Sequence, residues 1–153
     1  MQYFAYGSNM SRTLMSAHCP NAQALGCAVL DGWRFLVTTS GYASIMLAPG
    51  RQVHGVLWRL TPRDLAALNA YESVDSGLYR SRILPVCAGG RRVPALVYIG
   101  RNAPNGRPRP GYLETVVAAA EAWALPPDYV AGLRRWAPGA WRAARAPETG
   151  ELA

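Results

Sequence analysis

Short apolar runs separated by turn-forming dipeptides are the feature that most constrains the fold of this chain. Three such dipeptides, Asp31-Gly32, Pro49-Gly50 and Gly89-Gly90, interrupt the sequence between runs rich in branched and aromatic residues. Connections this short join antiparallel strands, because parallel strands need a long crossover. The predicted strands are residues 3–6, 24–30, 33–38, 42–47, 53–60, 79–87 and 93–99. Six or seven strands with short loops indicate a closed or nearly closed barrel.

Helical patterns appear in four places around these strands. Ser11 is a candidate N-cap for a short helix, and Thr61 with Pro62 marks the start of another. The predicted helices are residues 12–17, 62–70, 112–124 and 128–136, and residues 100–110 form a loop rich in Pro, Gly and Arg. The predicted class is therefore α+β, a small mixed, mostly antiparallel β-barrel with peripheral helices.

Length and composition predict a single domain. The 153 residues suit one domain, which we expect to span residues 1–137, with a frayed tail at 138–153. Half of the residues are apolar, which supports a real core, but no apolar stretch approaches the roughly 20 residues that cross a bilayer. Met1-Gln2-Tyr3 leads directly into a strand-like run without a secretory signal pattern. We therefore expect a cytoplasmic protein with no membrane partner.

The basic charge of the chain comes entirely from arginine. Its 16 basic residues are all Arg, against nine Asp and Glu, which gives a net charge of +7. The absence of lysine excludes Schiff-base chemistry, a P-loop lysine and a pyridoxal-phosphate anchor. The arginines are dispersed singly and in pairs such as Arg91-Arg92 and Arg134-Arg135. Without a dense basic stretch, we expect no nucleic-acid partner.

The cysteines and histidines do not form a metal motif. Cys19, Cys27 and Cys87 show no C-x-x-C spacing and are odd in number, which argues against a disulfide framework. His18 and His54 stand at spacings that no zinc motif uses. We therefore expect buried thiols that behave as small apolar side chains, and neither a metal nor a cofactor.

Glu72 differs from the other carboxylates, which fall at turns, on helix surfaces or in the tail. It stands at the end of the predicted middle helix, is preceded by Tyr71, and is followed by a turn before the strand that opens at Tyr79. A carboxyl desolvated at such a place has a raised pKa and suits general acid/base chemistry. The alternative is a glutamate at a helix end that faces water.

The segment Tyr6-Gly7-Ser8-Asn9 also has two interpretations. Gly7 allows a sharp turn after a buried strand, so the N–H groups of Gly7 to Asn9 could line one concavity and cradle an anion or a carbonyl. The alternative is an ordinary turn between strand and helix. A nucleophilic Ser8 would need a histidine base, and neither histidine of the chain is suitably placed.

Taken together, the motifs resemble the γ-glutamylcyclotransferase (AIG2-like) family. The resemblance covers about residues 2–133 and rests on four motifs in the family's order. They are YFAYGSNM at residues 3–10, GVLW at 55–58, YESVDSGLY at 71–79, and a late segment with Pro110-Gly111-Tyr112 followed by LPPDY at 125–129.

The resemblance implies an enzyme that needs no cofactor or metal. Its substrate is a small γ-glutamyl amide, whose α-amine attacks its own side-chain carbonyl to release 5-oxoproline and an amine or amino acid. Glu72 corresponds to the general acid/base of the family. The resemblance assigns substrate binding to Tyr6, Gly7, Ser8, Asn9, Met10, Tyr79 and Tyr112. The YGSN form of the loop is more similar to enzymes acting on γ-glutamyl amino acids than to relatives with YGT or YGSL loops.

One departure from the family pattern leaves alternatives open. Ser73 stands where the family often has glycine, and a positive φ there would strain a serine and displace the carboxylate. The chain is then either an active cyclotransferase, a cyclotransferase that deblocks a γ-glutamylated biosynthetic intermediate, or an impaired AIG2-like binding module. The sequence does not select the leaving amine, the group that binds the α-carboxylate, or the oligomeric state.

Overall fold

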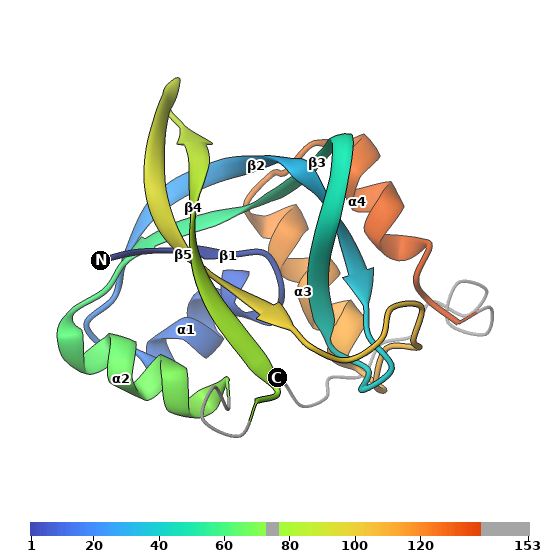
Figure 1. Cartoon of the computed structure of the whole chain (residues 1–153), viewed down its shortest axis with the longest axis horizontal. Helices are drawn as coiled ribbons and strands as arrows, with labels where there is room; N and C mark the ends of the chain where they lie inside the picture. The colour runs from blue at the N-terminus through green and yellow to red at the C-terminus, as the bar shows by residue number, and fades with distance from the viewer. Residues whose placement is uncertain (73–76, 139–153) are drawn as a thin grey trace.

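Five strands close into a barrel in this computed structural model, which describes residues 1–72 and 77–138 (Figure 1). The strands are β1 (Gln2–Ala5), β2 (Gln23–Val37), β3 (Ala43–Arg59), β4 (Tyr79–Ala88) and β5 (Arg91–Gly100). Their order around the barrel is β1-β3-β2-β4-β5. The α+β barrel predicted from the sequence is confirmed.

The first strand closes the barrel. β1 pairs antiparallel with β3, from Gln2 opposite Arg59 to Ala5 opposite Val56, and parallel with β5, where Tyr3 lies opposite Leu96. All other strand pairs are antiparallel, so the sheet is mixed as predicted.

Gly55 makes the contact between β1 and β3 possible. A Cβ at this position would lie 2.2 Å from the Ala5 carbonyl oxygen and 3.0 Å from the Phe4 ring. Only glycine therefore fits here, because the backbones of the two strands approach closely.

Two long strands replace four of the predicted short ones. Asp31-Gly32 and Pro49-Gly50 were expected to end strands, but β2 and β3 run through them as one antiparallel pair. The register shifts between Asp31 and Trp33, where one residue of β2 faces the four residues 48–51 of β3. This bulge accommodates a proline and two glycines with positive φ, so turn residues here bend the strands without ending them.

In the described part of the chain, four α-helices and one short 3₁₀ helix surround the barrel. They are η1 (Ser8–Met10), α1 (Arg12–His18), α2 (Pro62–Tyr71), α3 (Tyr112–Ala122) and α4 (Pro127–Arg134). Figure 1 shows α1 and α2 on one side of the barrel and α3 and α4 on the other. The predicted caps hold, because the Ser11 side chain accepts a bond from Leu14 N–H and Thr61 forms a capping box with Asp64.

The loop at residues 101–111 docks on the turn between β2 and β3. Gly106 N–H donates to the Val37 carbonyl at 2.8 Å, and Thr39 N–H donates to the Ala103 carbonyl at 2.9 Å. The Arg109 guanidinium lies 4.9 Å from the centre of the Tyr42 ring. The predicted loop is confirmed, and its backbone is fixed to the barrel.

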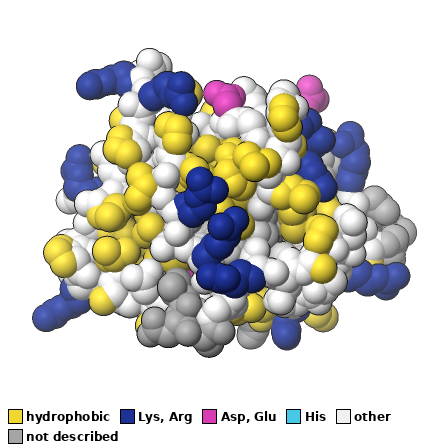
Figure 2. All heavy atoms as spheres, in the orientation of Figure 1, with side chains coloured by type: hydrophobic (Ala, Val, Ile, Leu, Met, Phe, Trp, Pro, Cys, Tyr) yellow, Lys and Arg dark blue, Asp and Glu magenta, His cyan; other side chains and the backbone are white. Residues whose placement is uncertain are grey.

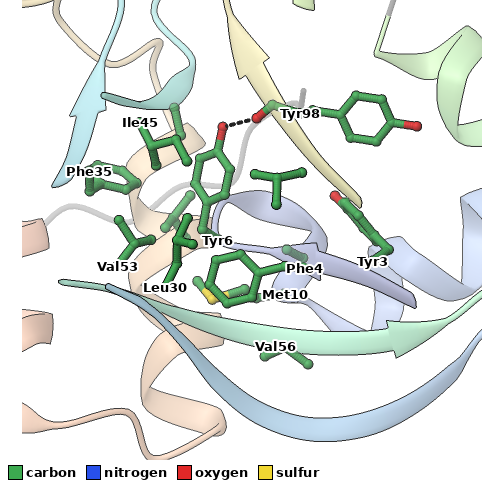
Figure 3. Packing of buried hydrophobic residues seen from close by; sticks show 14 of the residues in the cluster. Tyr3, Phe4, Tyr6, Met10, Leu30, Phe35, Ile45, Val53, Val56 and Tyr98 are labelled. Carbon is green, nitrogen blue, oxygen red and sulfur yellow. Dashed lines mark hydrogen bonds between the residues drawn. The ribbon is translucent and has the colours of Figure 1, made fainter. Parts of the chain in front are cut away.

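The core combines the barrel interior with the inner faces of the helices, and Figure 3 shows a part of it around Phe4 and Tyr6. The thiols depart from expectation, because only Cys19 is buried. Cys27 on β2 is exposed, and Cys87 on β4 is half-buried. The prediction of three buried thiols was wrong for these two residues.

The surface in Figure 2 carries dispersed arginine side chains with apolar atoms between them. Within the described residues, no helix is long and apolar enough to cross a membrane. Of the predicted tail at residues 138–153, residues 139–153 lie outside the part of the chain that the structure describes.

Candidate active site

A small cavity lies where the loop after β1 meets the end of α2. Its lining consists of Tyr3, Tyr6, Gly7, Ser8, Asn9, Ala43, Glu72, Tyr79, Tyr98 and Tyr112. About 20 Å³ of it is open to the centre of a water molecule, which is room for about one or two waters. The cavity therefore brings together two segments that are far apart in sequence, the YGSN loop and Glu72.

Glu72 is a buried carboxyl at the C-terminal end of α2. Its backbone N–H still bonds to the Leu68 carbonyl at 2.8 Å, so the helix fixes the position of its Cα. The residue is 8% exposed. Burial raises the pKa of Glu72 from 4.5 to about 7. Of the two sequence interpretations, the buried carboxyl is therefore the one observed, and the glutamate does not face water.

Asn9 connects Glu72 to the first strand. Its Nδ2 donates to the Tyr3 hydroxyl at 3.2 Å and to Glu72 Oε2 at 3.4 Å. The residue is 3% exposed, and its Oδ1 is buried without a hydrogen-bond partner among the described residues. The Asn9 amide therefore positions the Glu72 carboxylate through its nitrogen, while the amide oxygen Oδ1 remains without a partner among the described residues.

The loop is shaped by Gly7 and by a turn of 3₁₀ helix. A Cβ on Gly7 would lie 2.9 Å from the Tyr112 hydroxyl oxygen, so glycine lets the loop and the tyrosine approach. Met10 N–H then bonds back to the Gly7 carbonyl at 3.1 Å. The Met10 side chain points into the core and does not line the cavity, and its carbonyl accepts a bond from Trp123 Nε1 at 2.8 Å.

Three tyrosines of the cavity are tied to the barrel backbone. Tyr6 donates to the Tyr98 carbonyl at 2.5 Å, as Figure 3 shows, and Tyr79 donates to the Ala43 carbonyl at 2.8 Å. The Tyr112 hydroxyl accepts from Ala43 N–H at 3.2 Å. These bonds fix the walls of the cavity around Glu72.

The hydroxyls that surround Glu72 stay protonated at neutral pH. Burial raises the pKa of each tyrosine that lines the cavity, and the nearby charge of Glu72 raises it further. Glu72 is therefore the one group of the cavity lining that changes its charge near neutral pH.

The sequence did not single out all of the lining. Tyr3, Ala43 and Tyr98 reach the cavity because β1 lies beside β3 and β5. Such pairing depends on the closed barrel and has no local signal. The aromatic residues at positions 3, 4 and 6 were visible, but their presence does not tell which side chain faces a ligand.

Other sequence expectations can be placed in the same way. No histidine lines the cavity near Ser8. Within residues 1–72 and 77–138 there is no group of three or more His, Cys, Asp or Glu side chains that could hold a metal ion. Ser73, which stands in place of the usual glycine, lies outside the described residues.

Comparison with known proteins gives relatives along most of the chain. The sequence pattern of the AIG2-like family matches residues 52–133. A mouse protein named gamma-glutamylcyclotransferase is 29% identical over 153 residues, which cover 92% of this chain and 80% of the mouse protein. A human protein of the same name is 28% identical and covers 83% of this chain and 73% of its own length.

Solved structures share the architecture. One named gamma-glutamyl cyclotransferase superimposes with a TM-score of 0.84 at 25% identity, covering 100% of this chain and 93% of its own. An uncharacterized human protein superimposes with a TM-score of 0.83 at 26% identity, covering 99% of this chain and 92% of its own. The similarity thus extends over the barrel and the helices.

Proposed function

This chain belongs to the AIG2-like family, and from that membership and the geometry of its cavity we propose that it is a γ-glutamylcyclotransferase. The reaction is an intramolecular aminolysis of a γ-glutamyl amide, which yields 5-oxoproline and a free amine or amino acid. We also propose that the protein acts in the cytoplasm on a small γ-glutamyl molecule. It has neither a nucleic-acid partner nor a membrane partner in this proposal.

The observation that carries the proposal is the buried carboxyl of Glu72. The α-amine of the substrate must lose a proton as it attacks, and the departing nitrogen must gain one. One carboxyl can perform both transfers in turn if its pKa lies near the working pH. The pKa of Glu72, raised to about 7 by burial, meets that condition.

The remaining lining suits the other requirements of ring closure. The γ-glutamyl chain has to fold so that its amine meets its own carbonyl, and fixed walls promote this by positioning. We assign binding of the γ-glutamyl group to the loop of Tyr6, Gly7, Ser8 and Asn9, together with the walls formed by Tyr79 and Tyr112. Met10 then contributes through the loop backbone only, because its side chain packs in the core.

Substrate entry must change the cavity. The space for about one or two waters is smaller than a γ-glutamyl group. We therefore expect the substrate to displace these waters and to widen the space between the lining side chains, while Tyr6, Tyr79 and Tyr112 keep their bonds to the barrel backbone. The YGSN form of the loop favours a γ-glutamyl amino acid over a γ-glutamylamine as the substrate.

The test is 5-oxoproline release from a panel of γ-glutamyl dipeptides and γ-glutamylamines by wild type and Glu72→Gln. The glutamine has the same shape but cannot take the amine proton, so we expect kcat to fall by about 1,000-fold. The matched control is Glu121→Gln, a carboxylate whose side chain is 54% exposed and pairs with Arg134 on the surface. This control should retain wild-type turnover.

Two results would contradict the proposal. Turnover by folded Glu72→Gln at the wild-type rate would remove Glu72 from the chemistry. Absence of turnover by wild type on the whole panel would instead favour the alternative of an AIG2-like binding module.

A further inference from the structure

Among Tyr3, Tyr6 and Tyr79, the hydroxyl hydrogens are of two kinds, those already bonded within the fold and those left for a ligand. A tyrosine hydroxyl carries one hydrogen and can donate one hydrogen bond. The Tyr6 hydroxyl donates its hydrogen to the Tyr98 carbonyl, and the Tyr79 hydroxyl donates its hydrogen to the Ala43 carbonyl. Neither of them has a hydrogen left for a ligand.

Tyr3 is of the other kind. It is 4% exposed and lines the cavity, and its hydroxyl oxygen accepts from Asn9 Nδ2 at 3.2 Å. Among the described residues, no acceptor takes the hydrogen of this hydroxyl. The ring is held by an edge-to-face contact with Tyr98 at 5.7 Å between ring centres. Tyr3 therefore presents a fixed donor at the cavity.

Asn9 presents the complementary acceptor. Its Nδ2 donates hydrogen bonds to Tyr3 and Glu72, while its Oδ1 is buried without a hydrogen-bond partner among the described residues. Buried polar atoms without partners are rare and costly, so an unused donor and an unused acceptor side by side indicate a ligand with both an oxygen and an N–H. An amide carbonyl with a neighbouring amine has these groups.

We propose that Tyr3 is a catalytic residue whose hydroxyl donates to the γ-carbonyl oxygen of the substrate, a role that rests on the proposed function. In the first step, the α-nitrogen forms a bond to the carbon of the γ-carbonyl group, the carbonyl π electrons move to the oxygen beside Tyr3, and Glu72 takes the proton of the nitrogen. In the second step, the carbonyl reforms, the bond to the leaving nitrogen breaks, and Glu72 returns the proton to that nitrogen.

The position of Tyr3 relative to Glu72 indicates that the carbonyl oxygen of the substrate is the group that accepts the Tyr3 hydrogen bond. Both side chains accept from the single nitrogen Nδ2 of Asn9, so they flank one point of the cavity. The carbonyl carbon is bonded in the intermediate to both nitrogens between which Glu72 moves the proton, and the carbonyl oxygen is attached directly to that carbon. A donor next to Glu72 is therefore placed where negative charge develops, and its effect is larger because the cavity is buried.

Steady-state kinetics of Tyr3→Phe test this assignment on a γ-glutamyl substrate that wild type turns over. Phenylalanine keeps the ring packing and removes only the hydroxyl. We expect kcat to fall by about 100-fold while KM changes by less than about 3-fold, because the bond strengthens in the transition state. The control is Tyr129→Phe, which removes a hydroxyl from a ring that packs on His54 away from the cavity. This control should stay within about 2-fold of wild-type kcat.

Thermal unfolding of each variant separates a chemical role from a structural one. An unchanged melting temperature with a reduced kcat supports the donor role of Tyr3. A kcat of Tyr3→Phe within about 3-fold of wild type, or a rise in KM alone, would overturn this assignment and leave the cyclotransferase proposal standing. Absence of turnover by wild type would overturn both.

Discussion

Asn9 sets the environment of the carboxyl that carries the proposed chemistry. Its amide nitrogen is a neutral donor that lies 3.4 Å from Glu72 Oε2. Replacing that amide with a carboxyl of the same shape would put a second acid beside a buried one. Like charges this close disfavour ionisation of both groups, so the pKa of the second ionisation of the pair must rise.

Asn9→Asp should therefore move the acidic limb of the pH profile of kcat/KM upward by about one pH unit or more. The wild-type limb is expected near 7, the pKa of Glu72. Asn102→Asp adds the same charge on an exposed loop position and serves as the control. Equal midpoints for wild type and Asn9→Asp would mean that the limb reports another group.

The second scale is that of the element, where α2 carries Glu72 at one end and a capping box at the other. The Thr61 hydroxyl accepts from Asp64 N–H at 3.1 Å, and Asp64 Oδ2 accepts from Thr61 N–H at 3.2 Å. Near the other end, the Tyr98 hydroxyl donates to Asn69 Oδ1 at 2.5 Å, which ties the helix to β5. Stability and chemistry are thus supported by different ends of one helix.

Thr61→Ala should lower the free energy of unfolding by about 1 kcal/mol, because it leaves the first turn of α2 without its side-chain acceptor. The kcat should change little, since the bond between Asn69 and Tyr98 still holds the end that carries Glu72. Urea unfolding measures the first quantity, and Thr61→Ser is the matched control that keeps the hydroxyl. If the serine variant loses as much stability as the alanine variant, the capping bond is not the cause.

The elements also show which features of the fold can be predicted from local sequence. Caps are local, so Ser11 and Thr61 could be identified as helix starts from their neighbours alone. Strand ends are not local: Gly32 and Gly50 have the positive φ of turn residues, with values of 87° and 85°, yet the cross-strand pairing continues past both. For the same reason Glu72 and the YGSN loop were predictable from motifs, whereas Tyr3 needed the closed barrel to reach the cavity.

At the scale of the whole molecule, the buried carboxyl makes folding depend on pH. Glu72 has an ordinary pKa of 4.5 in an unfolded chain and a pKa of about 7 in the fold. Between these values the folded state holds a proton that the unfolded state has released, so stability falls as pH rises. His18 and His54 act in the opposite direction, since burial lowers the pKa of both.

Comparison of wild type with Glu72→Gln isolates the contribution of this carboxyl, because the histidines are common to both proteins. The difference between a pKa of 4.5 and one of about 7 corresponds to about 3 kcal/mol, at about 1.4 kcal/mol per pKa unit. Urea unfolding should therefore give similar stabilities at about pH 4, and a variant more stable than wild type by up to about 3 kcal/mol at about pH 8. A difference that stays constant between these two pH values would mean that Glu72 ionises as freely in the fold as in water, and a carboxyl of that kind lacks the pKa that proton transfer in both directions requires.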